Sequence, residues 1–158
     1  MRVVRRILGV WLSLWATAVL TGVVLKFTWR PDAEPSNPSF SLVSIFDGVD
    51  FRPTTSELTT SKALTFFGGT KLDLRRADTS APVIHLDLTT VMGGTDVTVP
   101  DTWRVTVQGP AMAGGHEIHV ADHESLDPDA THLIIRARTV MGGLRVQARP
   151  VLSSAKTG

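Results

Sequence analysis

Two residue types are missing from this chain of 158 residues: cysteine and tyrosine. Without cysteine the protein forms no disulfide, offers no thiolate to a metal, and has neither a CxxC redox pair nor a cysteine nucleophile. Without tyrosine it lacks one common acid–base and recognition group. Charged residues make up 20% and the formal net charge is +1, so the composition does not indicate a nucleic-acid-binding protein. Any chemistry therefore depends on histidine, carboxylate, hydroxyl and basic side chains.

One long apolar run lies near the start of the chain. Residues 7–25 contain no charged side chain, and a helix of that length spans about 28 Å, close to the ~30 Å hydrocarbon core of a membrane. The run exceeds the roughly 7–15 residues of a signal-peptide core, and no small-residue cleavage site follows it. We therefore predict an N-terminal transmembrane signal anchor over residues 1–30. Three arginines precede the run and two basic residues follow it, which predicts a cytoplasmic N-terminus and an extracytoplasmic domain in the cell membrane.

The anchor conceals the charge of the remaining chain. Residues 1–30 hold five of the 16 basic residues and no acid, so residues 31–158 hold 11 basic residues against all 15 acids. Residues 31–39 contain three prolines and two serines and are predicted to be an extended linker. Residues 150–158 are small and polar, and are predicted to be a disordered tail.

A repeated pair of small residues organises the segment between linker and tail. Five segments align on a glycine every 21 to 28 residues, and in four of them another glycine precedes it; the first segment has Asp47 there. The predicted structural glycines are Gly48, Gly68, Gly69, Gly93, Gly94, Gly114, Gly115, Gly142 and Gly143. Apolar and polar residues alternate on both sides of each pair, as in half-buried strands. Each unit is therefore expected to be a strand, a glycine corner with positive φ and close backbone approach, a second strand and a polar turn.

Units of this length are too short for propeller blades and cannot bury an apolar face alone. We predict an all-β repeat domain over residues 40–149 that resembles a β-helix or solenoid, in which equivalent strands stack. A β-sandwich of short strands is the alternative.

Several of these segments are similar to a known family. They are FFGGTKLDL at 66–74, VMGGTDVTVP at 91–100 with WRVTV at 103–107, and VMGGLRV at 140–146. Together they resemble the C-terminal domain of LiaF-like proteins, described as cell wall-active antibiotics response proteins with a toast-rack β-fold. The resemblance implies a role in envelope-stress sensing, often through restraint of a sensor histidine kinase.

The histidine cluster is the candidate metal site. His116, His119 and His123 lie close together with acidic neighbours, a set that could bind zinc or copper. On a strand, however, His116 and His119 point to opposite faces, so we predict neither a metal nor a cofactor. No nucleophile lies beside an oriented base, and almost all Ser and Thr residues are expected at turns or on outward positions. The chain is therefore not predicted to be an enzyme.

Apolar residues at the corners form the candidate interaction patch. Phe66, Phe67, Met92 and Met141 lie next to the glycine pairs, and at least one residue of two adjacent ones must point outward from a strand. Outward apolar residues in several units could align into a patch for a partner, unless loops or the chain ends cover them.

These observations predict a membrane-anchored, non-catalytic β-repeat domain that acts by protein–protein interaction in the bacterial cell-envelope stress response or signalling. A sensor kinase is one candidate partner, a homo-oligomer is another possibility, and nucleic acid is not expected. The first alternative is a membrane-tethered, self-assembling β-helix scaffold similar to bactofilins. The second alternative is an envelope metal-binding protein or hydrolase.

Overall fold

The computed structural model describes residues 34–152. The predicted anchor at 1–30 and most of the predicted tail lie outside the described residues. Among the described residues, no helix has both the length and the apolar character needed to cross a membrane.

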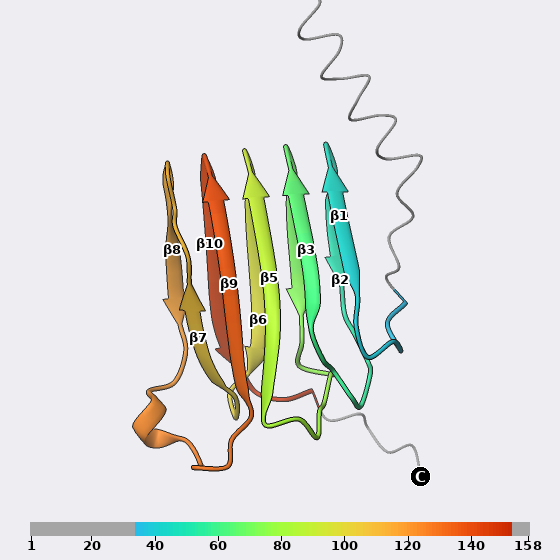
Figure 1. The fold of residues 1–158 in the computed structure, drawn as a ribbon, viewed down its shortest axis with the longest axis vertical. Coiled ribbons are helices and arrows are strands. Elements are labelled where there is room, and N and C mark those ends of the chain that lie inside the picture. The colour runs from blue at the N-terminus through green and yellow to red at the C-terminus, as the bar shows by residue number, and fades with distance from the viewer. Residues whose placement is uncertain (1–33, 153–158) are drawn as a thin grey trace, which may run out of the picture. The chain divides into compact units, whose positions relative to one another are not determined.

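Ten strands form two five-stranded sheets in which every pairing is parallel (Figure 1). The first sheet has the order β1 (Ser41–Ile45), β3 (Ser61–Phe66), β5 (Val83–Val91), β9 (His132–Val140), β7 (Arg104–Gln108). The second has the order β2 (Gly48–Phe51), β4 (Gly69–Asp73), β6 (Gly94–Pro100), β10 (Gly142–Arg149), β8 (Gly114–His119). One short 3-10 helix, η1 (His123–Ser125), lies in the loop between β8 and β9.

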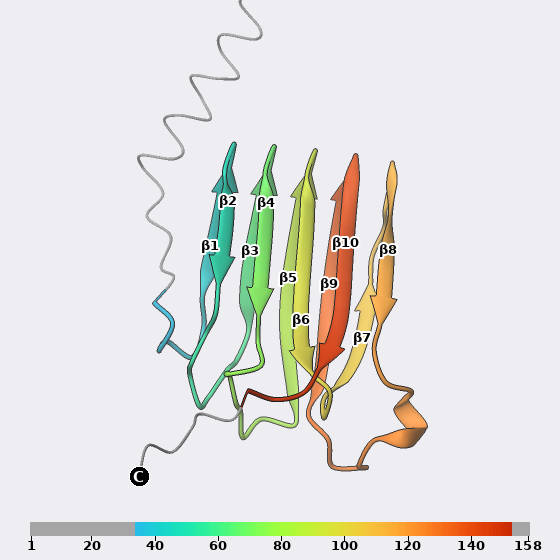
Figure 2. The ribbon, with the colours of Figure 1, turned by 180° about the vertical axis from the view of Figure 1, so that it is seen from behind.

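Each repeat contributes one strand to each sheet. A strand runs up the first sheet, turns at the small-residue corner, and runs down the second sheet, and a loop at the opposite end leads to the next strand (Figures 1 and 2). We call each such unit a rung, so that rung 1 is β1 and β2 and rung 5 is β9 and β10. The prediction of an all-β, solenoid-like repeat is confirmed at this level. The two sheets lie face to face as in a sandwich, but the strands within each sheet are parallel and the corners join the two layers.

The rungs do not stack in chain order. Rung 5 lies between rungs 3 and 4, because β9 pairs with both β5 and β7 while β10 pairs with both β6 and β8. Rung 4 therefore lies two positions beyond rung 3 in the stack, and rung 5 occupies the position between them. The spatial order is rung 1, 2, 3, 5, 4.

The first position of each corner pair requires glycine for steric reasons. A Cβ added at Gly68, Gly93 or Gly142 would overlap the backbone carbonyl of the corner in the preceding rung of the stack. The same carbonyls accept hydrogen bonds from the next rung, as in Gly94 N to Gly68 O at 3.1 Å. Asp47 occupies this position in rung 1, where no rung precedes it. The one departure from glycine therefore marks the end of the stack.

The expectation that the glycine pair supplies positive φ is wrong for four corners. There the positive φ falls on the residue before the pair, in Phe46, Phe67, Met92 and Met141, at 52 to 55°. Only in rung 4 does a corner glycine, Gly114, have positive φ. The pair is needed for close approach of backbones, and the preceding residue makes the turn.

The core consists of columns of inward-facing side chains. One column in the second sheet runs through Phe51, Leu72, Val97 and Val146, which are all buried. In the first sheet, two columns of buried residues pair Leu86 with Ile135 and Leu88 with Ala137. Each residue packs on its equivalents above and below, so no rung could bury its inner face alone.

The two glycines of one corner give a matched test of this steric account. Gly93→Ala should lower the free energy of unfolding by about 2 kcal/mol or more, because its Cβ meets the Gly68 backbone, which cannot move aside without disturbing the stack. Gly94→Ala has open space around its Cβ and no positive φ, so it should be neutral or slightly stabilising. Thermal unfolding of the two variants, followed by circular dichroism, measures the difference. Equal effects of both substitutions would contradict the steric account.

Candidate functional site

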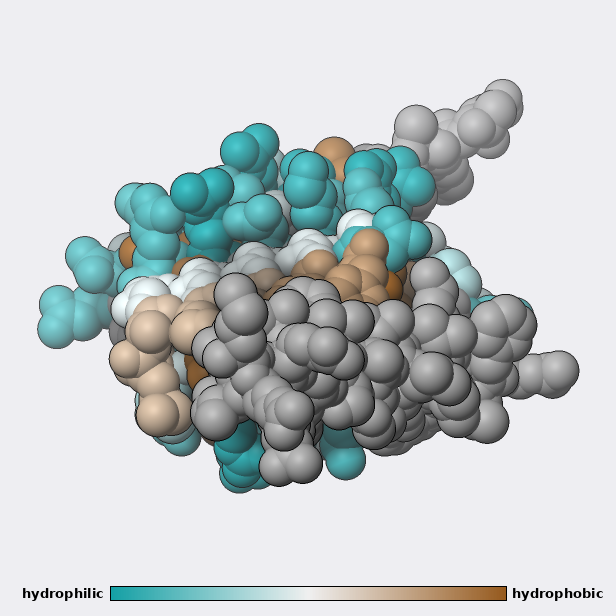
Figure 3. Space-filling view, turned by 90° about the horizontal axis from the view of Figure 1, so that it is seen from above, coloured by the Kyte–Doolittle hydropathy of each residue, from teal (hydrophilic) through white to brown (hydrophobic). Residues whose placement is uncertain are grey.

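An apolar surface follows the corners across the stack. Phe46, Phe67, Met92 and Met141 are 54%, 37%, 40% and 51% exposed, and they come from rungs 1, 2, 3 and 5, which are consecutive in space. The residues before them form a second row, with Phe66 beside Val91 and Val91 beside Val140. We call these seven residues the apolar crest. Figure 3 looks onto this end and shows brown, tan and pale residues with teal residues on both sides of them.

Aromatic rings order one half of the crest. The rings of Phe46 and Phe67 stack at a centroid distance of 5.2 Å, and Phe66 meets Phe67 edge to face at 4.8 Å. The four residues predicted as a patch, Phe66, Phe67, Met92 and Met141, therefore lie on one continuous surface. Phe46 was not among them, although its place before the first corner aligns with Phe67 and Met92.

Four residues of the crest, Phe46, Phe67, Met92 and Met141, have a strained backbone with positive φ. A non-glycine residue with φ near +50° costs about 1–2 kcal/mol, and asparagine or glycine would fit more easily than Phe or Met. Exposed Phe and Met side chains recover little of this cost through burial. Four bulky apolar residues thus occupy strained and exposed positions, which neither the turn nor the core requires.

The predicted histidine cluster is divided between two faces of β8. The Nε2 atom of His116 lies 3.4 Å from the Oγ1 atom of buried Thr139, so this imidazole faces inward. His119 faces outward, with Nδ1 3.9 Å from a carboxylate oxygen of Glu117. The side chain of His123 is outside what the structure describes. Within residues 34–152, no three His, Asp or Glu side chains gather in a way that could hold a metal ion.

A row of alternating charge crosses the outer face of the second sheet. In spatial order it reads Asp50, Lys71, Asp96, Arg145, Glu117. Arg145 lies between two acids, with its Nε atom 2.9 Å from Glu117 and its Nη1 atom 3.8 Å from Asp96. The hydrogen bond from Arg145 lowers the pKa of the Glu117 carboxyl, and the arginine's own pKa is raised by the same bond. The alternation exists only because rung 5 separates rungs 3 and 4.

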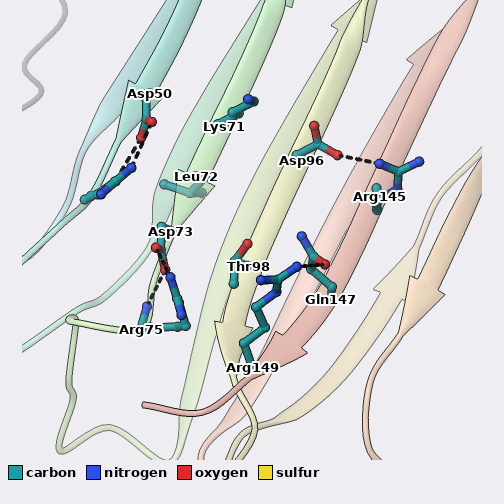
Figure 4. A pocket seen from close by; sticks show the side chains of 11 residues that line it. Asp50, Lys71, Leu72, Asp73, Arg75, Asp96, Thr98, Arg145, Gln147 and Arg149 are labelled. Atoms are coloured by element: carbon teal, nitrogen blue, oxygen red, sulfur yellow. Dashed lines mark hydrogen bonds and ion pairs between the residues drawn. The ribbon is translucent and has the colours of Figure 1, made fainter. Parts of the chain in front are cut away.

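A shallow groove of about 290 Å³ lies on the same outer face (Figure 4). It has three carboxylates, and each lies near an arginine of the groove. Asp50 is 3.1 Å from Arg52 and Asp73 is 2.7 Å from Arg75, while Asp96 faces Arg145. The hydrogen bond from Arg75 lowers the pKa of Asp73. This lowered pKa favours the charged form of Asp73, which is the reverse of what a general acid near neutral pH requires.

Buried hydroxyls form a ladder beneath the corners. The expectation that almost all Ser and Thr lie at turns or on outward positions is wrong for Thr65, Thr70 and Thr90, which are buried together with Thr95. The Oγ1 atom of Thr95 lies 2.7 Å from that of Thr90 and 3.3 Å from that of Thr65, which is 2.7 Å from Thr70. Ser44 continues the ladder in rung 1 by donating to the Asp47 carbonyl at 2.6 Å. The hydroxyls satisfy one another where the two sheets approach the corners.

Comparison with protein-family models, with curated proteins and with solved structures finds no match. The similarity to LiaF-like proteins therefore stays a prediction from the sequence motifs.

The hydroxyl ladder makes a prediction about stability. Thr95→Val should destabilise the fold by about 1–3 kcal/mol, because Thr90 is left buried without its 2.7 Å partner. The double variant Thr90→Val and Thr95→Val removes both groups, and should lose less stability than the sum of the two single variants. Denaturant unfolding of the four proteins in this cycle gives the coupling energy. Additive losses would show that the two hydroxyls do not support each other.

Proposed function

We propose that this protein acts by binding another protein at the bacterial cell envelope, with the apolar crest as its binding surface and without catalysis. The observation that carries the proposal is the exposure of Phe46, Phe67, Met92 and Met141 at strained backbone positions. Strain that the fold does not need is typical of functional sites. Contiguous exposed apolar residues are typical of docking surfaces.

The course of the chain leaves the crest accessible within the domain. Residues 35 and 38 bond to the loop after β2, through Thr54 N to Pro35 O and Thr59 N to Pro38 O, both at 2.7 Å. The described chain therefore begins at the loop end of the strands, and the crest lies at the corner end.

The resemblance to LiaF-like domains supports the biological setting. It favours an envelope-stress response or signalling role, with a sensor kinase as a candidate partner. A single-span anchor would keep the domain at the membrane surface, where such a partner lies.

A bactofilin-like polymer receives less support. Head-to-tail stacking would place β2 of one copy beside β8 of another in parallel register. Glu117 would then lie beside Asp50, which is a like-charge pair. The Cβ of Asp47 would also occupy the place that a corner glycine leaves open for the neighbouring carbonyl. Both features oppose continuation of the stack at rung 1.

A hydrolase or metal protein is also less well supported. The carboxylates of the groove are matched with arginines, and the two described histidines of the cluster face opposite sides of β8. Neither arrangement sets a base beside a nucleophile.

A triple substitution tests the crest. Phe67→Asn, Met92→Asn and Met141→Asn together remove three of the seven apolar side chains of the crest but keep a residue that tolerates positive φ. The melting temperature should stay equal or rise. Restoration of the response to a cell wall-active antibiotic in a deletion strain should fall at least severalfold.

Val151→Asn is the matched control, since it removes an apolar side chain that is 50% exposed outside the corners. It should restore the response fully. A triple variant that folds, reaches the membrane and restores the response as well as the unaltered chain would refute the crest as the binding surface.

A further inference from the structure

The two ends of the stack differ in how they are covered. At rung 1, the core column ends on Phe51, which is 7% exposed and packs on Phe40 at a ring-centroid distance of 4.9 Å. At rung 4, the same column ends on Ile118, which is 45% exposed although its neighbour Val146 is fully buried. This column of the second sheet is therefore covered at rung 1 and exposed at rung 4, whereas Val105 of β7, in the first sheet of rung 4, is buried.

β8 is the edge strand of the second sheet at rung 4. It pairs with β10 on one side, and no described strand pairs with it on the other. A strand edge of this kind is a template for a further strand. Its outward residues Glu117 and His119 are exposed, and the only ion pairs they make within the described residues are with Arg145 and with each other.

The last described residue lies away from this edge. The backbone N–H of Leu152 bonds to the carbonyl of Arg75, which follows β4 in rung 2.

A second copy of this chain suits the edge in one orientation. Parallel addition of β2 is opposed by Asp47 and by the Asp50–Glu117 contact, so β8 of the second copy would pair antiparallel with β8 of the first. In such a dimer, each residue must pair with a residue whose side chain lies on the same face of the sheet. The two-fold axis therefore passes beside one residue, which pairs with its own copy, and not between two residues. β8 spans Gly114–His119, so an axis at Ile118 pairs the last three residues of the strand, 117–119, with the same residues of the second copy.

Charge selects the same register. An axis at Ile118 sets Glu117 opposite His119 of the other copy, twice by symmetry, and brings the two exposed Ile118 side chains together. An axis at Glu117 would oppose two carboxylates, and an axis at His119 would oppose two imidazoles.

We propose that the protein forms a two-fold dimer through antiparallel pairing of β8 with β8 of a second copy, centred on Ile118. The edge is short, and interfaces of this size are weak between free partners. Two copies held in one membrane by the predicted anchor meet at a high effective concentration, which favours a weak interface. The surface is separate from the crest, so this dimer does not rest on the proposed function.

The absence of cysteine allows a direct test in membranes. Opposite residues in an antiparallel pair have Cα atoms about 4.5–5.5 Å apart, within the range of a disulfide. Full-length Ile118→Cys should therefore form a disulfide-linked dimer on mild oxidation of membranes. Asp50→Cys, on the edge strand β2 at the other end of the stack, is the matched control and should stay monomeric.

Changing the charge at position 119 distinguishes a specific dimer from random collision of two chains in the membrane. In the Ile118→Cys chain, His119→Glu should lower the linked fraction by about threefold or more, because each Glu117 then faces a like-charged carboxylate in place of an imidazole that can donate a hydrogen bond. His119→Lys should keep or raise it. Co-purification of two differently tagged full-length copies that carry only the His119 substitutions should show the same order, which guards against a folding defect of the Ile118 variant.

Three results would overturn the dimer. The first is equal linkage of the Ile118→Cys and Asp50→Cys chains. The second is linkage of Ile118→Cys to a different protein in place of itself. The third is a ladder of multimers from a chain that carries both Asp50→Cys and Glu117→Cys, which would indicate head-to-tail stacking.

Discussion

The packing of one rung's carbonyl into the empty Cβ position of the next corner is the constraint on which the structure depends. Gly68, Gly93, Gly142 and Gly114 leave this space. In the first three, the carbonyl that fills it also accepts a hydrogen bond from the same neighbouring corner. Since a shift of one residue would turn every side chain to the other face, the corners fix the register of both sheets. The buried columns, the charged row and the crest are all aligned by that register.

Much of the fold follows from local patterns in the sequence, but the order of the rungs does not. Alternation and the glycine pairs predict strands, corners and inner columns, because those features depend on neighbours along the chain. Which rungs touch depends on neighbours in space. The charges of Asp96, Glu117 and Arg145 do indicate the spatial order of the rungs. Stacking in chain order would place the like charges of Glu117 and Asp96 side by side, whereas the observed order places Arg145 between them.

The candidate site was predictable in part. Phe67, Met92 and Met141 could be identified because they precede glycine pairs, and Phe46 was missed because its corner has Asp47 in place of glycine. The positive φ of these residues was not predictable from residue type, since Phe and Met seldom adopt it. The hydroxyl ladder was missed for a different reason. Thr65 and Thr90 continue the inward alternation of their strands, but their polarity suggested an outward position.

The crest runs across the rungs and the β8 edge runs along a strand, so the two surfaces have perpendicular directions. This affects how they would act together. The crest runs across the rungs at the corner end, whereas the edge is the last strand of the stack. In an antiparallel dimer centred on Ile118, the two corner ends point in opposite directions along the strands. One partner molecule could not cover both crests on a single surface. The dimer would present two separate binding sites, and its affinity for a dimeric partner would depend on whether that partner spans the distance between them.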